Sequence, residues 1–385
     1  MPSHIQTGAL DHFASIWPEG ATGVWGEDIS PDRKALGWDQ ERLMHLQNIF
    51  LPAKGWETQV DEIVQAHRND IHILSGIGAY PPVTLAAHLL SRLPNPKMGL
   101  IVEPAVILGW KGYLRSIKAK WNYRNYVDLI NVVLAMGNQG RDFYLHAGFR
   151  ADQIVPFLYQ CPFGRVEKAS PRDDRVRFVY VGQLNHRKGI DQLLKAFLPL
   201  ADRDDWKLTV YGQGPMKEVL KEFVANHGLS NKISFPGMIQ ANQVLVHLGQ
   251  HDVCCVPSRF DGWGVVTNEA LQAGIPPIVS SSASSSDLVR YSGVGRVYRS
   301  GDIPALSRCL LEYITQPNLV QHEKRLAVSY SPSIMPDTVA GYMKQLFEHF
   351  FLAKGPTPLA PWTERHSVSE IKDKSLTSLH FRGKS

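Results

Sequence analysis

Short apolar runs alternate with longer stretches of helical periodicity along most of the chain. In the first half we expect strands at Thr22–Trp25, Asn48–Leu51, Asp70–Leu74, Met98–Val102, Asn131–Ala135 and Gln153–Phe157. In the second half we expect strands at Val176–Val181, Lys207–Tyr211, Ile233–Phe235, Val253–Val256 and Pro277–Ser280. Helical patterns separate them, for example over Glu57–His67, Val83–Leu93, Gly189–Phe197 and Met216–Asn226. This alternation predicts an α/β fold with parallel sheets.

A polar segment that begins at Pro162 and contains Gly164 and Pro171 marks the best domain boundary. A chain of 385 residues is long enough for two domains of ordinary size. We therefore predict an N-terminal domain over residues 1–162, a linker over 163–174 and a second domain over 175–330. Residues 331–354 are expected to form a helix that packs back on the first domain. Residues 355–385 are polar and proline-rich at their start, which predicts a loosely ordered tail.

Composition and charge limit the classes of function that the protein can have. The net charge of +5 is too small for a dedicated nucleic-acid binder but fits anionic ligands or an anionic membrane surface. The four cysteines lack metal-ligand spacing, which favours a reducing compartment, and Cys254 and Cys255 are expected to be buried strand thiols. The sequence has no signal-peptide pattern and no apolar run of about 18 residues. We expect a cytoplasmic protein, soluble or peripheral on the inner face of the plasma membrane.

The first informative motif follows the strand that ends at Val181. It reads Val179-Tyr-Val-Gly182-Gln-Leu-Asn-His-Arg187-Lys188-Gly189. A glycine that permits close backbone approach, two cations and a following helix are the parts from which phosphate sites are built. An ordinary loop with solvated cations is an equally good interpretation of this motif alone. The nearby Tyr211-Gly-Gln-Gly214 turn is better explained as a plain turn.

The second motif follows the strand that ends at Val256 and carries two carboxylates. It reads Pro257-Ser-Arg-Phe-Asp261-Gly-Trp-Gly264-Val-Val-Thr-Asn-Glu269-Ala-Leu-Gln-Ala-Gly274-Ile-Pro276. A loop with Asp261, Gly262 and Gly264 leads into a helix that carries Glu269. Loop amides and a helix N-terminus that point at one place favour a diphosphate. Glu269 can accept two hydrogen bonds from a ribose diol, and Asp261 can hold sugar hydroxyls.

The two motifs together resemble the retaining glycosyltransferases of family four (glycosyl transferases group 1), which use sugar nucleotides. That family has an E-x7-E signature in a stretch similar to P-S-x-x-E-G-F-G-x-x-x-x-E-A, and here Asp261 and Trp263 replace its first Glu and its Phe. The resemblance covers about 120 residues closely. It implies the GT-B fold, two Rossmann-like α/β/α domains that face a central cleft. Family members begin with a strand and a glycine-rich loop, whereas residues 3–16 resemble the helix that follows them.

The resemblance also implies roles for individual residues. Lys188 would pair with the donor diphosphate, and Arg187 would assist because Gln183 stands where the family usually has Arg. Glu269 would bind the ribose and Asp261 the donor sugar. The remaining donor-site residues that it implies are Gly182 in the phosphate loop, the amides of Gly262, Trp263 and Gly264, Val265 and Val266 around the ribose, and Gly237 beside Phe235 in the base pocket.

The first half offers weaker candidates. Glu103 follows the strand that ends at Val102, on the side where ligands bind in open α/β sheets, and many relatives carry a His there. Its carboxylate can accept a proton from the acceptor or a hydrogen bond from the donor sugar. A strand-end Glu in solvent or in a salt bridge is the alternative. Gly76-Ile-Gly78 is either part of the acceptor cleft or a flexible turn, and Arg141 is better explained as a surface cation.

Residues 110–124 combine five cations with several aromatic residues and contain no acidic residue. As a helix, the segment can lie on an anionic bilayer, which a lipid-linked acceptor would explain. An ordinary basic helix with a core-facing apolar stripe is the alternative, and it is slightly favoured.

We therefore expect an enzyme that moves a hexose-type sugar from a UDP- or GDP-sugar to a glycan or lipid-linked acceptor with retention of configuration, in surface polysaccharide or lipopolysaccharide biosynthesis. Asp261, Glu103 and Lys188 are the expected catalytic residues. The best carboxylate pair, Asp202-Arg-Asp204, lies in a polar loop, so no metal and no cofactor are required. A nicotinamide-dependent dehydrogenase is disfavoured because Gly76-Ile-Gly78 lacks the third glycine. The alternative function is a non-catalytic binding subunit of a biosynthetic complex.

Overall fold

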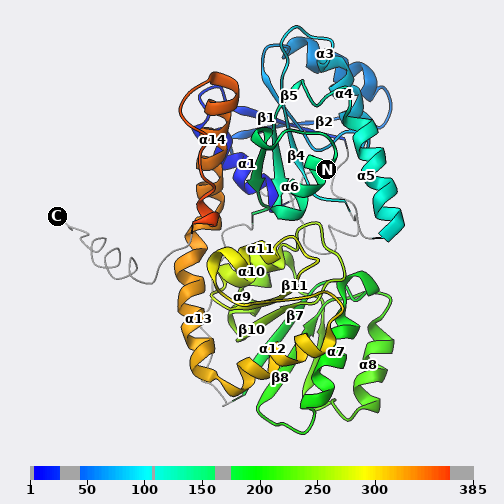
Figure 1. Ribbon diagram of the computed structural model, residues 1–385, viewed down its shortest axis with the longest axis vertical. Coiled ribbons are helices and arrows are strands. Elements are labelled where there is room, and N and C mark those ends of the chain that lie inside the picture. The colour runs from blue at the N-terminus through cyan, green and yellow to red at the C-terminus, as the bar shows by residue number, and fades with distance from the viewer. Residues whose placement is uncertain (1–3, 27–43, 106–108, 161–174, 365–385) are drawn as a thin grey trace, which may run out of the picture.

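The computed structural model describes residues 4–26, 44–105, 109–160 and 175–364. Its elements form two bodies, one above the other in Figure 1. The upper body contains two parallel sheets, with strand orders β1-β2 and β3-β4-β5-β6. The lower body contains one six-stranded sheet of order β12-β11-β10-β7-β8-β9. Every recorded strand pair is parallel, as the alternation of apolar runs and helical patterns predicts.

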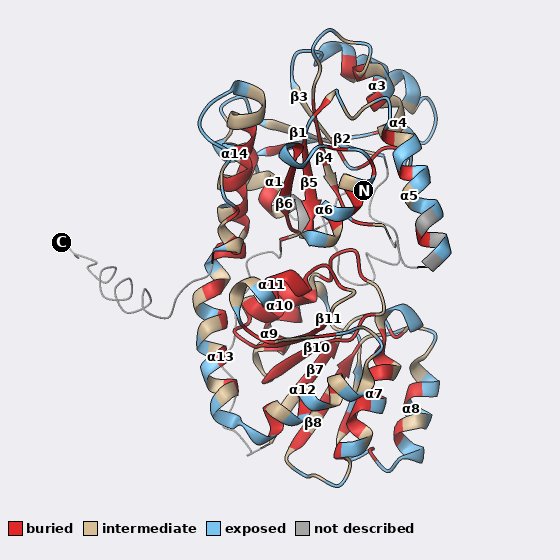
Figure 2. Ribbon diagram, viewed as in Figure 1, coloured by how far each residue is buried: buried red, intermediate tan, exposed pale blue. Residues whose placement is uncertain are grey.

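The upper body is built from short, mostly buried strands. They are β1 (Ala21–Trp25), β2 (Leu46–Phe50), β3 (Ile71–Leu74), β4 (Lys97–Val102), β5 (Ile130–Met136) and β6 (Ile154–Phe157). The helices described around them are α1 (His4–Ile16), α3 (Trp56–Ala66), α4 (Pro81–Leu90), α5 (Gly109–Tyr123) and α6 (Gly137–His146). Figure 2 shows that the central strands are the most buried part of this body. Met98, Leu100 and Leu134 have no exposed surface, because apolar runs in a central parallel strand are covered on both faces.

The lower body follows the same plan. Its strands are β7 (Val176–Val181), β8 (Trp206–Tyr211), β9 (Ile233–Gly237), β10 (Val253–Val256), β11 (Pro277–Ser280) and β12 (Arg296–Tyr298). Its helices are α7 (Ile190–Phe197), α8 (Lys217–Asn226), α9 (Val244–Gly249), α10 (Val266–Gln272), α11 (Ser286–Ser292) and α12 (Ile303–Thr315). Phe178, Phe197 and Trp206 fill the core between β7, α7 and β8. Cys254 and Cys255 are buried in β10, as predicted.

Two helices lead from the lower body back to the upper one. They are α13 (Pro317–Tyr330) and α14 (Pro336–Leu352), which form the long left-hand column in Figure 1. Phe347 of α14 packs against Phe13 and Trp17 of α1, with ring centroids 5.0 and 5.9 Å apart. This apolar seam ties the end of the chain to its start.

The beginning of the predicted tail is ordered, which corrects one expectation. Trp362 is only 2% exposed, its ring lies 5.1 Å from that of Tyr342, and its carbonyl accepts a 2.7 Å hydrogen bond from the Tyr330 hydroxyl. Burial of one large indole outweighs the polar, proline-rich composition around it. The predicted linker, residues 163–174, and the end of the tail lie outside the described residues.

The predicted strands all occur, most with bounds that differ by one or two residues. Among the described strands, β12 is the one that was not predicted, because its three residues are too few to give a periodic pattern. In the described part of the chain α1 is the first element and no strand precedes it, which agrees with the helix expected over residues 3–16.

Candidate functional site

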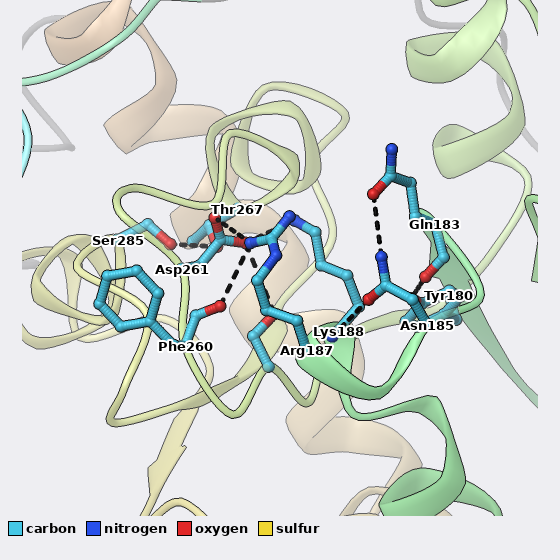
Figure 3. A network of polar contacts seen from close by, with 10 residues as sticks. Tyr180, Gln183, Asn185, Arg187, Lys188, Phe260, Asp261, Thr267 and Ser285 are labelled. Atoms are coloured by element: carbon cyan, nitrogen blue, oxygen red, sulfur yellow. Dashed lines mark hydrogen bonds and ion pairs between the residues drawn. The ribbon is translucent and has the colours of Figure 1, made fainter. Parts of the chain in front are cut away.

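Three loops meet at one edge of the lower sheet. They follow β7, β10 and β11, which are neighbours in the strand order. Because parallel strands place their carboxyl ends at the same edge, residues far apart in sequence come together there. Figure 3 shows the side chains of Arg187, Lys188 and Asp261 pointing toward one another across these loops.

The loop after β7 fixes its two cations through a short 3-10 turn, His186–Lys188. The side chain of Asn185 caps this turn by accepting a 3.0 Å hydrogen bond from the Lys188 amide. Gly189 follows with φ +70°, and a Cβ at this position would lie 1.9 Å from the carbonyl oxygen of Pro257. Only glycine allows the loops after β7 and β10 to approach so closely. The turn therefore holds both cations against the second motif.

Asp261 is the partner of both cations. Lys188 Nζ lies 2.5 Å from Asp261 Oδ2, and Arg187 Nη1 lies 3.5 Å from Asp261 Oδ1. Asp261 is 8% exposed, and Ser258 Oγ also donates to it. An aspartate this deeply buried needs such partners, because an unpaired buried charge is strongly disfavoured.

Glu269 lies in the next helix, and its carboxylate has no hydrogen-bond partner in the described part of the chain. It is 8% exposed. Its burial raises the pKa of the carboxyl from 4.5 to about 7, and the nearby charge of Lys188 opposes that rise. The structure thus brings Lys188, Asp261 and Glu269 together around one point, as the two motifs predict.

The loop between Asp261 and α10 presents backbone donors. Within the described residues, no acceptor is recorded for the amides of Gly262, Trp263 or Gly264. The Trp263 side chain points elsewhere, because its indole is buried and donates a 2.8 Å hydrogen bond to Asn268. Val265 and Val266 likewise pack on apolar clusters, with Val266 buried in one of them. The amides of Gly262, Trp263 and Gly264 are therefore the donors that this loop offers to a ligand.

The glycines after β7, β8 and β9 form a chain of backbone contacts. The Gly182 amide donates to the carbonyl of Tyr211, and the Gly212 amide donates to the carbonyl of Gly237. A Cβ on Gly212 would lie 1.9 Å from the Gly182 oxygen, and one on Gly214 would lie 2.5 Å from the Leu184 oxygen. The Gly212–Gly214 segment is thus a turn that packs closely against the loop after β7. A Cβ built on Gly237 would meet no atom within 4 Å, so this glycine borders open space.

Glu103 reaches the site from the upper body. It is exposed and follows β4, and a Cβ built on Gly262 would lie 2.1 Å from Glu103 Oε2. The carboxylate therefore lies against the backbone of the loop that carries Asp261. No ion pair involves Glu103 in the described part of the chain, so the salt-bridge alternative finds no support there.

Other polar contacts join the two bodies beside the site. The Asn138 amide donates a 2.6 Å hydrogen bond to Asp287 Oδ2, and Gln139 Nε2 donates to the Ser281 oxygen at 2.9 Å. Arg141, on the same helix, pairs with Asp142 at the surface, in agreement with its interpretation as a surface cation.

The loop after β11 belongs to the site, although no sequence motif predicted it. Ser282 accepts from the Asp261 amide, and Ser285 exchanges a 2.7 Å hydrogen bond with Thr267 at the start of α10. These hydrogen bonds hold the loop that carries Asp261 on the side opposite to Arg187 and Lys188. The signal was present as six serines around Ala283, a run of small polar residues directly after a buried strand.

The described residues contain no cluster of His, Cys, Asp or Glu that suits a metal ion. Asp204, from the best carboxylate pair in the sequence, lies 2.9 Å from Lys232 Nζ in a surface loop. None of the described helices is long and apolar enough to cross a bilayer.

Comparisons with known proteins agree on one family. Residues 165–329 match the family model described as glycosyl transferases group 1. Over 330 residues the chain is 28% identical to the GDP-mannose-dependent alpha-(1-6)-phosphatidylinositol monomannoside mannosyltransferase of Mycolicibacterium smegmatis, covering 81% of this chain and 83% of that protein. Over 241 residues it is 30% identical to the lipopolysaccharide core biosynthesis mannosyltransferase LpsB of Rhizobium meliloti, covering 58% and 64% respectively.

The solved structures confirm the predicted fold. The Anabaena protein HepE in complex with UDP-glucose aligns with a TM-score of 0.67 at 15% identity, covering 90% of this chain and 96% of that one. At that identity the likeness concerns the fold alone, which is GT-B with two Rossmann-like domains. The family match makes residues 165–329 of this chain similar to glycosyl transferases group 1, and the structural likeness adds the fold alone.

Proposed function

We propose that the chain transfers a hexose-type sugar from a nucleotide-sugar donor to a glycan or lipid-linked acceptor, with retention of the anomeric configuration. The single observation that carries this proposal is the meeting of Arg187 and Lys188 with Asp261 and Glu269 at adjoining strand ends. Two cations, free amides and a buried carboxylate around one point suit a pyrophosphate joined to a ribose.

The diphosphate would be held by an exchange of ion pairs. Lys188 and Arg187 now neutralise Asp261. Phosphate oxygens carry more negative charge than one carboxylate and would draw both cations toward the donor, assisted by the amides of Gly262 and Gly264. Asp261 would then be released to accept hydrogen bonds from the sugar hydroxyls. In the reaction the same cations would stabilise the charge that develops on the leaving diphosphate.

Glu269 would bind the ribose. Its carboxylate lacks a hydrogen-bond partner in the described residues, and two ribose hydroxyls would supply two donors. Because its pKa lies near 7, the ionised form that accepts both bonds becomes populated only around neutral pH. Gly182, Val265 and Gly237 would line the nucleotide site, with Gly237 nearest to the base.

Glu103 would act on the acceptor side. It lies against Gly262 and approaches the site from the other domain, where an acceptor hydroxyl would enter. That hydroxyl would attack from the face that the diphosphate leaves, through a transition state with oxocarbenium character. The leaving phosphate would take the acceptor proton, and Glu103 would orient the hydroxyl or the donor sugar. No cofactor and no metal are needed for these steps.

The relatives suggest the chemical class of both substrates. One relative is named for GDP-mannose and a phosphatidylinositol mannoside, another for the lipopolysaccharide core, and HepE is seen with UDP-glucose. We therefore propose a UDP- or GDP-hexose as donor and an acceptor of surface polysaccharide or lipopolysaccharide biosynthesis. The protein would work in the cytoplasm, peripherally on an anionic membrane.

A panel of nucleotide sugars tests the proposal. A cognate donor binds only the folded state and would raise the melting temperature in a concentration-dependent way. The same donor would then be hydrolysed slowly or transferred to an acceptor, and the product would keep the donor's anomeric configuration by NMR. A donor that stabilises the protein without any turnover across acceptors would indicate the alternative function, a non-catalytic binding subunit. An inverted product would contradict retention.

A further inference from the structure

Helix α5 presents its large apolar side chains to solvent. Trp110, Leu114, Ile117 and Trp121 are 70%, 53%, 49% and 67% exposed. Their spacing of three or four residues places them along one side of the helix. Among the residues of α5 whose burial is described, Gly112, Ala119 and Tyr123 are buried, and Ala119 and Tyr123 pack in a hydrophobic core cluster. The helix therefore has a core-facing side, as the favoured alternative predicts, but its four exposed apolar side chains lie on the opposite side.

No other described helix has this property. Helices α1, α8, α12, α13 and α14 each expose a single large apolar residue, whereas α5 exposes four. Scattered single apolar residues are normal on a protein surface, but four exposed on one side of a helix form a patch typical of an interaction surface. Figure 2 shows α5 on the outer side of the upper body, largely exposed along its length.

The charge of α5 indicates what the partner is. Its sequence, GWKGYLRSIKAKWNY, contains cations and no acidic residue. Arg115, Lys118 and Lys120 are exposed within the stretch bounded by the two tryptophans, and the guanidinium of Arg124 lies 3.3 Å from the centre of the Trp121 ring. Tryptophan beside basic residues suits the boundary between acyl chains and anionic headgroups. A protein partner would need a deep groove and a matching row of acidic residues.

The position of α5 links the patch to the reaction. Only five residues lie between Glu103 and Gly109, the first residue of α5. In Figure 1 the N-terminal end of α5 is its lower end, directed toward the other domain. At the opposite end, the Tyr123 hydroxyl accepts a 3.3 Å hydrogen bond from the Ile77 amide, in the loop after β3. The helix therefore borders the strand ends of the acceptor side.

We propose that α5 docks the enzyme on an anionic lipid bilayer, with Leu114, Ile117 and the two tryptophans in the interface and the cations on the headgroups. This inference rests on the proposed function where it concerns the acceptor: an enzyme held in this way takes a sugar acceptor that is anchored in the same bilayer by a lipid chain.

Vesicle co-sedimentation tests the docking. Vesicles of phosphatidylcholine with phosphatidylglycerol are compared with pure phosphatidylcholine. The full chain is expected to bind the anionic vesicles more tightly. Replacing Leu114→Gln and Ile117→Gln should weaken that binding by roughly tenfold or more, and Lys118→Gln with Lys120→Gln should weaken it by roughly 30-fold at low salt. The matched controls on α8, Val219→Gln and Lys217→Gln, should bind as the unmodified chain does.

The outcomes separate this inference from the proposed function. All variants should keep the unmodified melting temperature and the unmodified rate of donor hydrolysis in the absence of lipid. Transfer to a vesicle-embedded acceptor should fall in the α5 variants, while transfer to a soluble short-chain analogue should not. Unchanged vesicle binding in both pairs of α5 variants would overturn the docking, as would a self-associating chain that these variants make monomeric. Vesicle binding without turnover of any donor would instead contradict the proposed function alone.

Discussion

The two domains hold their functional residues in different ways. In the lower domain, ion pairs and backbone contacts fix the site loops. Asp261, for example, contacts residues of all three loops, those after β7, β10 and β11. In the upper domain, Glu103 is exposed, its carboxylate lies against the Gly262 backbone, and no ion pair holds it in the described part of the chain. If the proposed function is right, the lower domain holds the donor diphosphate on preorganised groups, whereas Glu103 meets the acceptor with little support around it. Variants in the lower domain should therefore have larger effects than variants in the upper domain.

Lys188→Ala should have the largest effect. It removes the cation that we place on the leaving diphosphate and leaves Asp261 with only the more distant Arg187. We expect kcat/KM for the donor to fall about a thousandfold, as when other preorganised stabilising groups are removed. Steady-state kinetics with the cognate donor would measure it, and Lys217→Ala on α8 is the control. A variant with near-normal kinetics would place the diphosphate elsewhere.

Glu269→Gln should have the next largest effect, and its size should depend on pH. Loss of hydrogen bonds to a charged group should weaken donor binding about 30-fold at pH 8. In the unmodified chain, donor affinity should rise as the pH passes through about 7, because Glu269 ionises there. In the variant this dependence should disappear. Calorimetric titrations between pH 6 and 8 would measure both effects, and an unaltered pH profile in the variant would exclude Glu269 as its source.

The same substitution should stabilise the protein when no donor is present. The folded-state pKa of Glu269 lies near 7, above its ordinary value of 4.5. Folding therefore favours the neutral form, and this contribution to stability is present at low pH and lost as the pH rises through 7. At pH 8, Glu269→Gln should raise the free energy of unfolding by up to about 3 kcal/mol, and below pH 4.5 the gain should vanish. Urea denaturation at the two pH values would show it.

Gly262→Ala should slow turnover moderately, through its contact with Glu103 of the other domain. The new methyl would meet Glu103 Oε2, the end of an exposed side chain that can swing away, so stability should change little. Turnover should nevertheless fall roughly tenfold, because small displacements of positioned groups slow reactions strongly. In a Glu103→Ala background the same methyl should add no further loss. Gly341→Ala, which meets no atom within 4 Å, is the control. Additive losses in the double variant would show that Gly262 acts independently of Glu103.

Sequence patterns were sufficient for the fold and for the lower half of the site. Short apolar runs such as Val253–Val256 favour buried strands, and the two motifs carry Lys188, Asp261 and Glu269 at fixed sequence distances from such strands. The contact of Lys188 with Asp261 needs β10 beside β7, a strand order that local periodicity does not contain. The meeting of Glu103 with Gly262 and the exposed stripe of α5 depend on how whole domains and helices pack. For both Glu103 and residues 110–124 the sequence therefore left two interpretations open.

Asp287→Ala should have the smallest effect, because it acts only on how the domains are joined. Asp287 is buried and accepts the 2.6 Å bond from the Asn138 amide, but it contacts none of the proposed donor residues. We expect donor affinity to stay unchanged and turnover to fall about threefold, since the acceptor side loses part of its alignment with the donor. Arg290→Ala is the matched control, because it removes the other partner of Asp287 while leaving the bond between domains in place. A loss of donor affinity in Asp287→Ala would mean that α11 supports the nucleotide site directly, and the contrast between a rigid donor side and an adaptable acceptor side would then extend one helix further.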